Sequence, residues 1–143
     1  MRVTLNYCEN MHFSASARDF KDIQVDEPET FHGNNLAPSP IEYFLMGTGG
    51  CIGSTFVYCL QKNKIPIVNL EIVVDGTLKH SGPKGRLRLI NIEVELLITL
   101  KEDESKNNFN FCRKTFLEHC PISNLLKEVP LNIKVSKKLE DID

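Results

Sequence analysis

The sequence predicts an α+β domain, and three observations lead to this prediction. Short segments of alternating apolar and polar residues in the first third of the chain are typical of half-buried strands. Residues 43–60 contain no charged residue and have the length of a long helix. Residues 90–98 carry an apolar residue at every second position and predict a long strand in an antiparallel sheet. No repeat or linker interrupts the chain, so we expect one domain over residues 1–143.

The first third of the chain is expected to form three short strands. Alternation over residues 3–7 predicts the first strand, and a turn over residues 8–11 should lead into the next. Further strands are expected over residues 12–15 and 23–25. Residues 26–39 contain proline, glycine and asparagine breakers and should be irregular.

A strong helix-start signal follows. Ser39 is suited to the N-cap, Pro40 to the first helical position, and Glu42 has the spacing of a capping box. The helix is predicted to run to about Lys62, either unbroken or with a break in the Gly47-Thr-Gly-Gly run. We interpret it as a helix buried on nearly all sides, with glycines permitting close packing, rather than as a membrane span.

The second half predicts a long hairpin followed by helices. Leu70, Ile72 and Val74 alternate along the first hairpin strand, and a Gly-Pro-Lys-Gly turn precedes the second. The second strand should bury Ile90, Ile92, Val94, Leu96 and Ile98 on one face. We then expect a helix over residues 105–119, a short helix beginning at Pro121, and a final strand carrying Leu131, Ile133 and Val135.

Composition excludes several classes of function. The net charge is −2 and the basic residues are scattered, so we expect no nucleic-acid partner. No phosphate-binding glycine motif is present, and no close pair of cysteines has the spacing of a structural zinc site. We therefore expect no metal or cofactor. The first residues lack the apolar stretch of a signal peptide, so we expect no membrane association and a cytoplasmic location.

Five cysteines carry the candidate chemistry: Cys8, Cys51, Cys59, Cys112 and Cys120. An odd number without a close pair is a poor disulfide framework and favours free thiols in a reducing compartment. If the helix breaks at its glycines, Cys51 gains the positive end of a new helix dipole, which stabilises a thiolate. Pro121 places Cys120 at a helix N-cap, with the same advantage. Cys59 and Cys112 are expected to be core residues.

Two stretches of the sequence resemble one known family. Residues 33–51 run Gly-Asn-Asn-Leu-Ala-Pro-Ser-Pro-Ile-Glu and then through Gly-Thr-Gly-Gly to Cys51, following an Asp26-Glu-Pro sequence. Residues 118–123 read Glu-His-Cys-Pro-Ile-Ser. Both are similar to motifs of the OsmC/Ohr family, in which a Ser-Pro-x-Glu stretch leads to the peroxidatic cysteine and a Cys-Pro-Val-Ser motif follows later in the chain.

The resemblance implies a fold and an activity. It implies antiparallel sheets wrapped around central helices in an intertwined homodimer. Family members reduce organic hydroperoxides, and some reduce hydrogen peroxide, without haem, metal or flavin. By resemblance, Cys51 would be the peroxidatic cysteine and Cys120 its resolving partner. An external dithiol, lipoyl-type or thioredoxin-like, would recycle the disulfide.

One family feature is missing. The Ohr branch pairs an arginine from an early turn with a glutamate at the helix start. Glu42 matches the glutamate, but the first turn has no arginine, and Arg18 lies in the next turn. The chain therefore resembles the broader OsmC-like branch. On an unbroken helix Glu42 and Cys51 lie on opposite faces, so Glu42 would act through a break, across a dimer interface, or only as a helix cap.

Two other functions stay open at this stage. The chain could be a non-enzymatic dimer of the same fold that binds a small apolar ligand and uses its cysteines as core residues. It could also be a thiol-based redox sensor. Turnover of peroxide with a dithiol separates the enzyme from the binding module, and a reversible disulfide without useful turnover favours the sensor.

Overall fold

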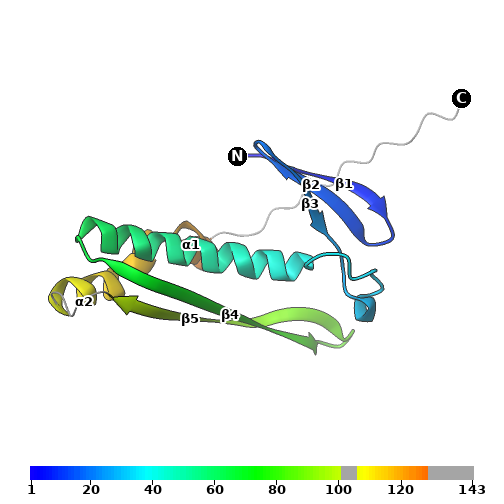
Figure 1. Cartoon of the computed structure of the whole chain (residues 1–143). Helices are drawn as coiled ribbons and strands as arrows, with labels where there is room; N and C mark the ends of the chain where they lie inside the picture. The colour runs from blue at the N-terminus through cyan, green and yellow to red at the C-terminus, as the bar shows by residue number, and fades with distance from the viewer. Residues whose placement is uncertain (101–105, 129–143) are drawn as a thin grey trace, which may run out of the picture.

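The computed structural model describes residues 1–100 and 106–128, and these form two separate sheets and one helical layer (Figure 1). The elements in chain order are β1 (Val3–Glu9), β2 (His12–Ala17), β3 (Phe20–Val25), η1 (Glu29–Phe31), α1 (Pro40–Lys62), β4 (Ile67–Ser81), β5 (Arg86–Leu100), α2 (Lys106–Thr115), η2 (Phe116–His119) and α3 (Pro121–Glu128). The predicted α+β class is confirmed. The predicted final strand over residues 131–135 lies outside the described residues.

The described strands form two sheets, one of three strands and one of two. Strands β1, β2 and β3 form an antiparallel sheet in that order, and β4 pairs with β5 in a long hairpin. In Figure 1 α1 runs along the hairpin, while the three-stranded sheet projects beyond the N-terminal end of α1. Helix α2 packs against α1 near its C-terminal end, and the segments after α2 continue along α1 to its middle. The hairpin, α1 and this helical segment enclose the core.

The start of α1 follows the predicted capping box. The Ser39 hydroxyl accepts the backbone N–H of Glu42 at 3.3 Å, and the Glu42 carboxylate accepts the backbone N–H of Ser39 at 2.6 Å. From there α1 continues without a break to Lys62. The alternative of a break in the Gly47-Thr-Gly-Gly run is wrong, and Gly49 in this run serves close packing instead. A Cβ at Gly49 would lie 2.7 Å from Cγ2 of Val74 on β4.

Helix α1 is buried on one face only, so the prediction of nearly all-round burial is wrong for the single chain. Its buried positions include Ile52, Phe56 and Leu60, which face the other helices. By contrast, Met46 is 55% and Tyr58 is 58% exposed. By length and composition α1 would pass as a membrane span, a test that the core helix of a soluble protein also passes.

The long hairpin shows the predicted alternation with one correction. Leu70, Ile72 and Val74 are half-buried between exposed residues, as predicted. The register between β4 and β5 shifts after Thr77. Thr77 faces Asn91, but Leu78 faces Leu89. This bulge skips Ile90, which is 51% exposed and not on the buried face with Ile92. A bulge adds one residue to a strand and so reverses the sidedness beyond it.

A buried carboxylate organises the loop between β3 and α1. Asp26 is fully buried, and its side chain accepts the backbone N–H groups of Glu27, Asn34 and Leu36 at 2.9, 3.1 and 3.1 Å. Burial alone would raise the pKa of this carboxyl, but the three backbone donors outweigh it and lower the pKa below its ordinary value. The loop that leads into α1 is therefore fixed around a charge.

Gly33 is the residue of this loop that cannot be replaced by alanine without strain. A Cβ at Gly33 would overlap the backbone carbonyl of Glu27, an atom that is itself fixed by accepting the N–H of Asn35 at 3.1 Å. We expect Gly33→Ala to lower the free energy of unfolding by about 1–3 kcal/mol, the usual cost of overpacking. The urea midpoint at fixed protein concentration measures this loss.

Gly47 provides the matched control. It lies within α1 and a Cβ there would meet no atom within 4 Å. Gly47→Ala should keep or raise stability, by roughly 0.5–1 kcal/mol, because alanine loses less backbone entropy in a helix. Equal midpoints for the two alanine variants would contradict the assigned role of Gly33.

Candidate functional site

The structure brings Cys51 and Cys120 together, although 69 positions separate them in the sequence. Their sulfur atoms lie 3.5 Å apart, and the thiol of Cys120 donates to the sulfur of Cys51. Both are free thiols. A sulfur pair at this distance needs only a small movement to form a disulfide.

Cys120 occupies the N-cap of α3, as predicted. Its backbone is extended, with φ −82° and ψ 115°, and its carbonyl accepts the first N–H of the helix, from Asn124, at 3.2 Å. Pro121 then fills the first helical position. Cys51 lies in the middle of α1, directly across from this junction.

The two thiols differ in exposure. Cys120 is fully buried, while Cys51 is half-buried. A solute that approaches from solvent therefore meets Cys51 first. Because Cys120 is held behind it within bonding reach, the arrangement allows one sulfur to react and the other to follow.

A helix N-terminus does reach Cys51, but it belongs to α3. The expectation of a new helix start within α1 is wrong, because α1 is continuous through Cys51. Burial raises the pKa of the Cys51 thiol, while the backbone N–H of Ile122 donates to its sulfur and lowers the pKa. The neighbouring Cys120 raises it again, so the net pKa lies above the ordinary value. The described contacts of this one chain do not activate the thiol.

Glu42 does not join Cys51 within the chain. Nine helical residues separate them, which places them on opposite faces and about 13 Å apart along the axis. Hydrogen bonds from the backbone and hydroxyl of Ser39 lower the pKa of the Glu42 carboxyl and keep it as a helix cap. Arg18 lies in the turn between β2 and β3, with its guanidinium 5.2 Å from the ring centre of Phe20.

A second sulfur pair corrects the prediction for the other cysteines. Cys59 on α1 and Cys112 on α2 form a disulfide with a Cα–Cα distance of 5.6 Å, so they are not free thiols, although Cys112 is buried in the core as predicted. The signal was present in the spacing: Cys59 follows Cys51 by eight residues, and Cys112 precedes Cys120 by eight. Two antiparallel helical segments with one such pair in register will have the other in register as well. The remaining thiol, Cys8, is exposed and lies in β1, not in the predicted turn.

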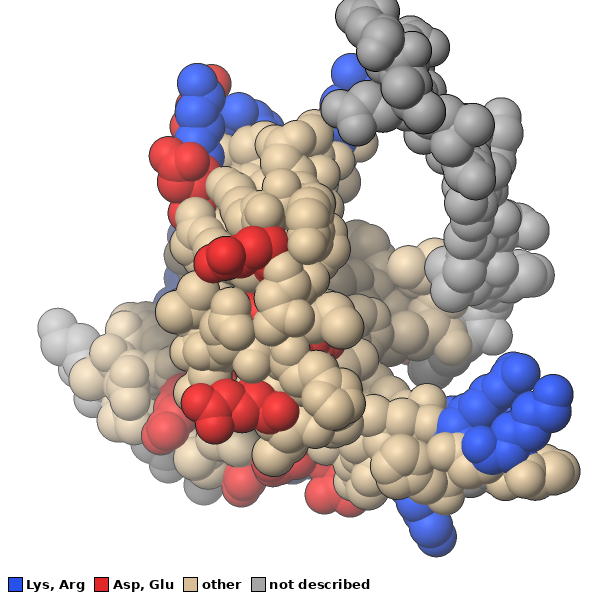
Figure 2. All heavy atoms as spheres, turned by 90° about the vertical axis from the view of Figure 1, so that its right-hand side faces the viewer, with Lys and Arg blue, Asp and Glu red and all other residues tan. Residues whose placement is uncertain are grey.

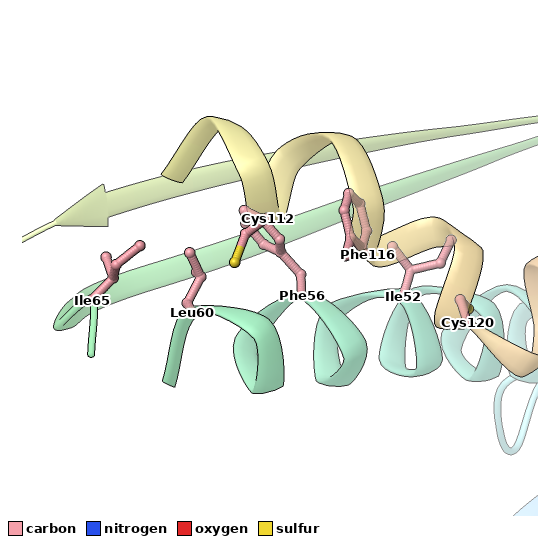
Figure 3. Packing of buried hydrophobic residues seen from close by; sticks show 7 residues of the cluster. All are labelled: Ile52, Phe56, Leu60, Ile65, Cys112, Phe116 and Cys120. Atoms are coloured by element: carbon pink, nitrogen blue, oxygen red, sulfur yellow. The ribbon is translucent and has the colours of Figure 1, made fainter. Parts of the chain in front are cut away.

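Aromatic side chains fill the space between the two sulfur pairs. Phe56 from α1 packs on Phe116 with ring centres 4.8 Å apart, and Phe109 meets Phe56 edge-on at 6.2 Å. Figure 3 shows Phe56, Leu60, Cys112 and Phe116 pointing into the space between α1 and the helical segment that follows β5. These phenylalanines are core residues, whereas Phe111 is 56% exposed and lies outside this core.

Within the described residues, no group of three or more His, Cys, Asp or Glu side chains is placed to hold a metal ion. On the face of the molecule in Figure 2, charged side chains form small groups separated by broad uncharged surface. The reactive groups that the structure brings together at the site are the thiols of Cys51 and Cys120.

Comparisons with known proteins agree with this geometry. Residues 32–135 match the family model described as OsmC-like protein. The fold is similar to the crystal structure of an OsmC-like protein from Mycoplasma pneumoniae, with a TM-score of 0.73 and 21% identity over 90% of this chain and 87% of that one. It is also similar to an organic hydroperoxide resistance protein OsmC from Legionella pneumophila, with a TM-score of 0.62 and 19% identity over 88% of each chain. These identities show the fold alone.

A curated relative also matches part of the sequence. Protein YhfA of Escherichia coli (strain K12) is 26% identical over 84 residues, which are 59% of this chain. The match spans 60% of the length of that protein.

The backbone amide of Ile122, which donates to the sulfur of Cys51, can be removed by substitution. Ile122→Pro removes the donor N–H while proline is tolerated in the first turn of a helix, and Ile122→Ala keeps the N–H as a control. A hydrogen bond to a charged group is worth about 1.5–3 kcal/mol, so at pH 7 iodoacetamide should alkylate Cys51 roughly tenfold more slowly in the proline variant.

The difference should depend on pH. Loss of the N–H donor raises the pKa of Cys51. The alkylation rates of the two variants should therefore converge at high pH, where Cys51 is fully ionised in each of them. Peptide mapping after timed alkylation gives the rate at Cys51. Equal rates in both variants at neutral pH would show that the amide does not stabilise this thiolate.

Proposed function

The chain belongs to the OsmC-like protein family, and from that premise we propose that it is a cysteine-dependent reductase of organic hydroperoxides. The observation that carries the proposal is the 3.5 Å separation of two thiols of unequal exposure, with Cys51 open to a solute and Cys120 buried behind it. Two relatives of similar fold, from Legionella pneumophila and Elizabethkingia anophelis, are described as organic hydroperoxide resistance proteins.

The proposed reaction begins at Cys51. Its thiolate attacks one oxygen of the hydroperoxide, the O–O bond breaks, and the other oxygen leaves as an alcohol after taking a proton. The sulfur is oxidised to a sulfenic acid. The N–H of Ile122, at the start of α3, holds the negative sulfur before the attack.

Cys120 completes the oxidation. Its sulfur attacks the sulfenic acid, a Cys51–Cys120 disulfide forms and water leaves. Because the two sulfur atoms already lie 3.5 Å apart, this step should outrun a second oxidation of Cys51. An external dithiol, lipoyl-type or thioredoxin-like, then reduces the disulfide and is itself oxidised. No step requires a metal or an organic cofactor.

The group that activates Cys51 is proposed to come from a second copy of the chain. Within one chain the pKa of Cys51 is raised, and Glu42 caps its own helix on the far face. Glu42 is exposed and lines an open hollow of about 380 Å³ together with Met46 and Gly50 of α1. An intertwined homodimer would cover this hollow and bring charged groups from the partner to the site.

The proposal also covers the branch of the family and the cellular location of the protein. Because the first turn lacks an arginine, we assign the chain to the broader OsmC-like branch and not to Ohr proper. Organic hydroperoxides are the proposed substrates, with hydrogen peroxide as a poorer one. A catalytic cycle that depends on free thiols suits a reducing compartment, and the cytoplasm is the proposed location.

The central experiment is a turnover assay with cumene hydroperoxide and hydrogen peroxide, using dihydrolipoamide and thioredoxin as competing reductants. Turnover of cumene hydroperoxide with one of the two dithiols supports the proposed reaction. A reversible Cys51–Cys120 disulfide without turnover would favour a redox sensor. Protein that stays reduced in peroxide would favour a module that binds a small apolar ligand.

Serine variants separate the roles of the two cysteines. We expect Cys51→Ser to abolish even a single turnover, because a serine hydroxyl without an adjacent base is a poor nucleophile. Cys120→Ser should still consume about one equivalent of peroxide, since the first step needs only Cys51. Its sulfenic acid should be trapped by dimedone and should proceed to sulfinic acid in excess peroxide. Intact mass after stoichiometric cumene hydroperoxide measures both outcomes.

The result that reverses the assignment is equally clear. If Cys120→Ser is inert and Cys51→Ser gains one oxygen, Cys120 is the peroxide-reacting thiol. Cys8→Ser serves as the matched control, because Cys8 is an exposed thiol on β1, and it should leave turnover unchanged.

The proposed homodimer rests on an uncovered apolar face of the N-terminal sheet. Leu5, Phe13 and Val25 line an open hollow of about 460 Å³ beneath this sheet, and Leu5 remains 53% exposed. Leu5→Glu should weaken the dimer, because it places a charge in the apolar contact. Thr4→Glu puts the same charge on the opposite face of β1 and should leave the dimer intact.

Sedimentation equilibrium at micromolar concentration checks the assembly. The unmutated protein should show twice its chain mass of 16.3 kDa, and the Leu5→Glu variant should shift toward the mass of a single chain. A monomeric unmutated protein would remove the dimer from the proposal, and with it any role of Glu42 across an interface.

A further inference from the structure

The Cys59–Cys112 disulfide lies at the edge of a hollow that the proposed peroxidase reaction does not use. The hollow has a volume of about 280 Å³ and opens between the C-terminal end of α1 and the α2–η2 segment. The residues that line it are Tyr58, Cys59, Lys62, Asn63, Phe111, Thr115 and His119. A small molecule bound there would lie against one sulfur of the disulfide.

Only one of the two sulfur-bearing residues is open to this hollow. Cys59 is half-buried and lines it, whereas Cys112 is fully buried between α1 and α2, as Figure 3 shows. Thiol–disulfide exchange requires a thiolate to reach one sulfur in line with the bond while the other sulfur leaves. The difference in exposure fixes Cys59 as the attacked sulfur and Cys112 as the leaving sulfur.

The side chain of Asn63 is placed to assist the leaving sulfur. Its amide nitrogen donates to the backbone carbonyl of Cys59 at 2.9 Å, which anchors the side chain at the end of α1. The same nitrogen lies 3.3 Å from the sulfur of Cys112 and 3.7 Å from that of Cys59. A primary amide has two N–H groups, so one can bond the carbonyl while the other stabilises a thiolate on Cys112.

Charge around the hollow favours an acidic ligand. Lys62 and His119 are exposed and line it, and Lys62 is fixed above the ring of Tyr58 with its ammonium 5.0 Å from the ring centre. No Asp or Glu is among the described residues that line the hollow. A thiol that carries a carboxylate would therefore be drawn to this position more strongly than a thiol that carries an amine.

This pair is a separate site from Cys51 and Cys120. Eight helical residues place Cys59 about 12 Å beyond Cys51 along α1. Phe56, Phe116 and Leu60 fill the core between the pairs. Direct exchange between the two pairs would require this core to open.

We propose that Cys59–Cys112 is a second thiol–disulfide exchange site that equilibrates with small acidic thiols. The thiolate of the small molecule attacks the sulfur of Cys59, the protein S–S bond breaks, and Cys112 leaves as a thiolate that then takes a proton from solvent. A second molecule attacks the small-molecule sulfur of the mixed disulfide, releases a symmetrical disulfide and leaves Cys59 as a thiol. Two thiols are oxidised and one protein disulfide is reduced, and the reverse steps restore it.

The test uses protein in which Cys51→Ser and Cys120→Ser silence the first pair. In this background Cys112→Ser leaves Cys59 and Cys8 as the two thiols, with Cys8 as an exposed internal control on β1. The probes are glutathione disulfide, which is acidic, and cystamine, which is basic. Peptide mapping gives the rate of mixed-disulfide formation at each cysteine.

The expected result is that Cys59 reacts faster with glutathione disulfide than with cystamine, a preference that Cys8 should not show. The exposed ammonium of Lys62 should make the ratio of the glutathione disulfide rate to the cystamine rate roughly fivefold higher at Cys59 than at Cys8. Lys62→Gln should reduce this preference, while Lys21→Gln, which removes the same charge from β3, should leave it unchanged. Equal preferences at the two cysteines would overturn the proposal.

A second measurement does not depend on the Cys112 variant, whose buried position makes folding a concern. With the Cys59–Cys112 disulfide intact, the protein is equilibrated in buffers of reduced and oxidised glutathione, and alkylation followed by intact mass gives the fraction oxidised. Reversible reduction in native buffer supports an exchange site. A disulfide that persists in excess reduced glutathione and opens only in denaturant would show a structural cross-link. Because the first pair is silenced, either result leaves the peroxidase proposal untouched.

Discussion

The contact between α1 and the helical segment after β5 is the interaction on which the sulfur chemistry depends. Phe56 packs on Phe116 at its centre, and Leu60 and Cys112 are completely buried beside them. Apolar burial of this kind fixes how far one helix can slide along another, because interiors are packed as closely as crystals. The positions of all four sulfur atoms follow from this one alignment.

A different kind of contact holds α1 against the hairpin. Glycines at positions 49 and 53 let the helix lie directly against β4, where Ile72 and Val74 occupy the space that side chains would need. The helix is thus fixed between a glycine contact with the hairpin and an aromatic contact with α2 and η2. Because these two contacts fix the rotation of α1 about its axis, the sulfur of Cys51 is held toward Cys120 and the start of α3.

Much of the fold could be predicted from the sequence because its signals are local. The capping box at Ser39 and the N-cap at Cys120 depend on a few neighbouring residues, and both were predicted. The errors arose where distant packing decides. A bulge opposite Thr77 turns Ile90 outward, and contact with β4 keeps α1 continuous through its glycines. The bond between Cys59 and Cys112 depends on the alignment of two helices, which no local pattern determines.

The equal spacing of the sulfur pairs has a covalent consequence. When Cys51 and Cys120 are joined as well, the two bridges and the chain between them close a ring made of nine residues from each segment. Such a ring has its own topology, which persists even if the hydrophobic contacts inside it are lost. Oxidation of Cys51 and Cys120 then adds a second covalent link to a helix pair that already has one, and neither segment can shift by a helical turn. The redox state of the Cys59–Cys112 pair would thereby change the mechanical stiffness of the region that carries Cys51 and Cys120.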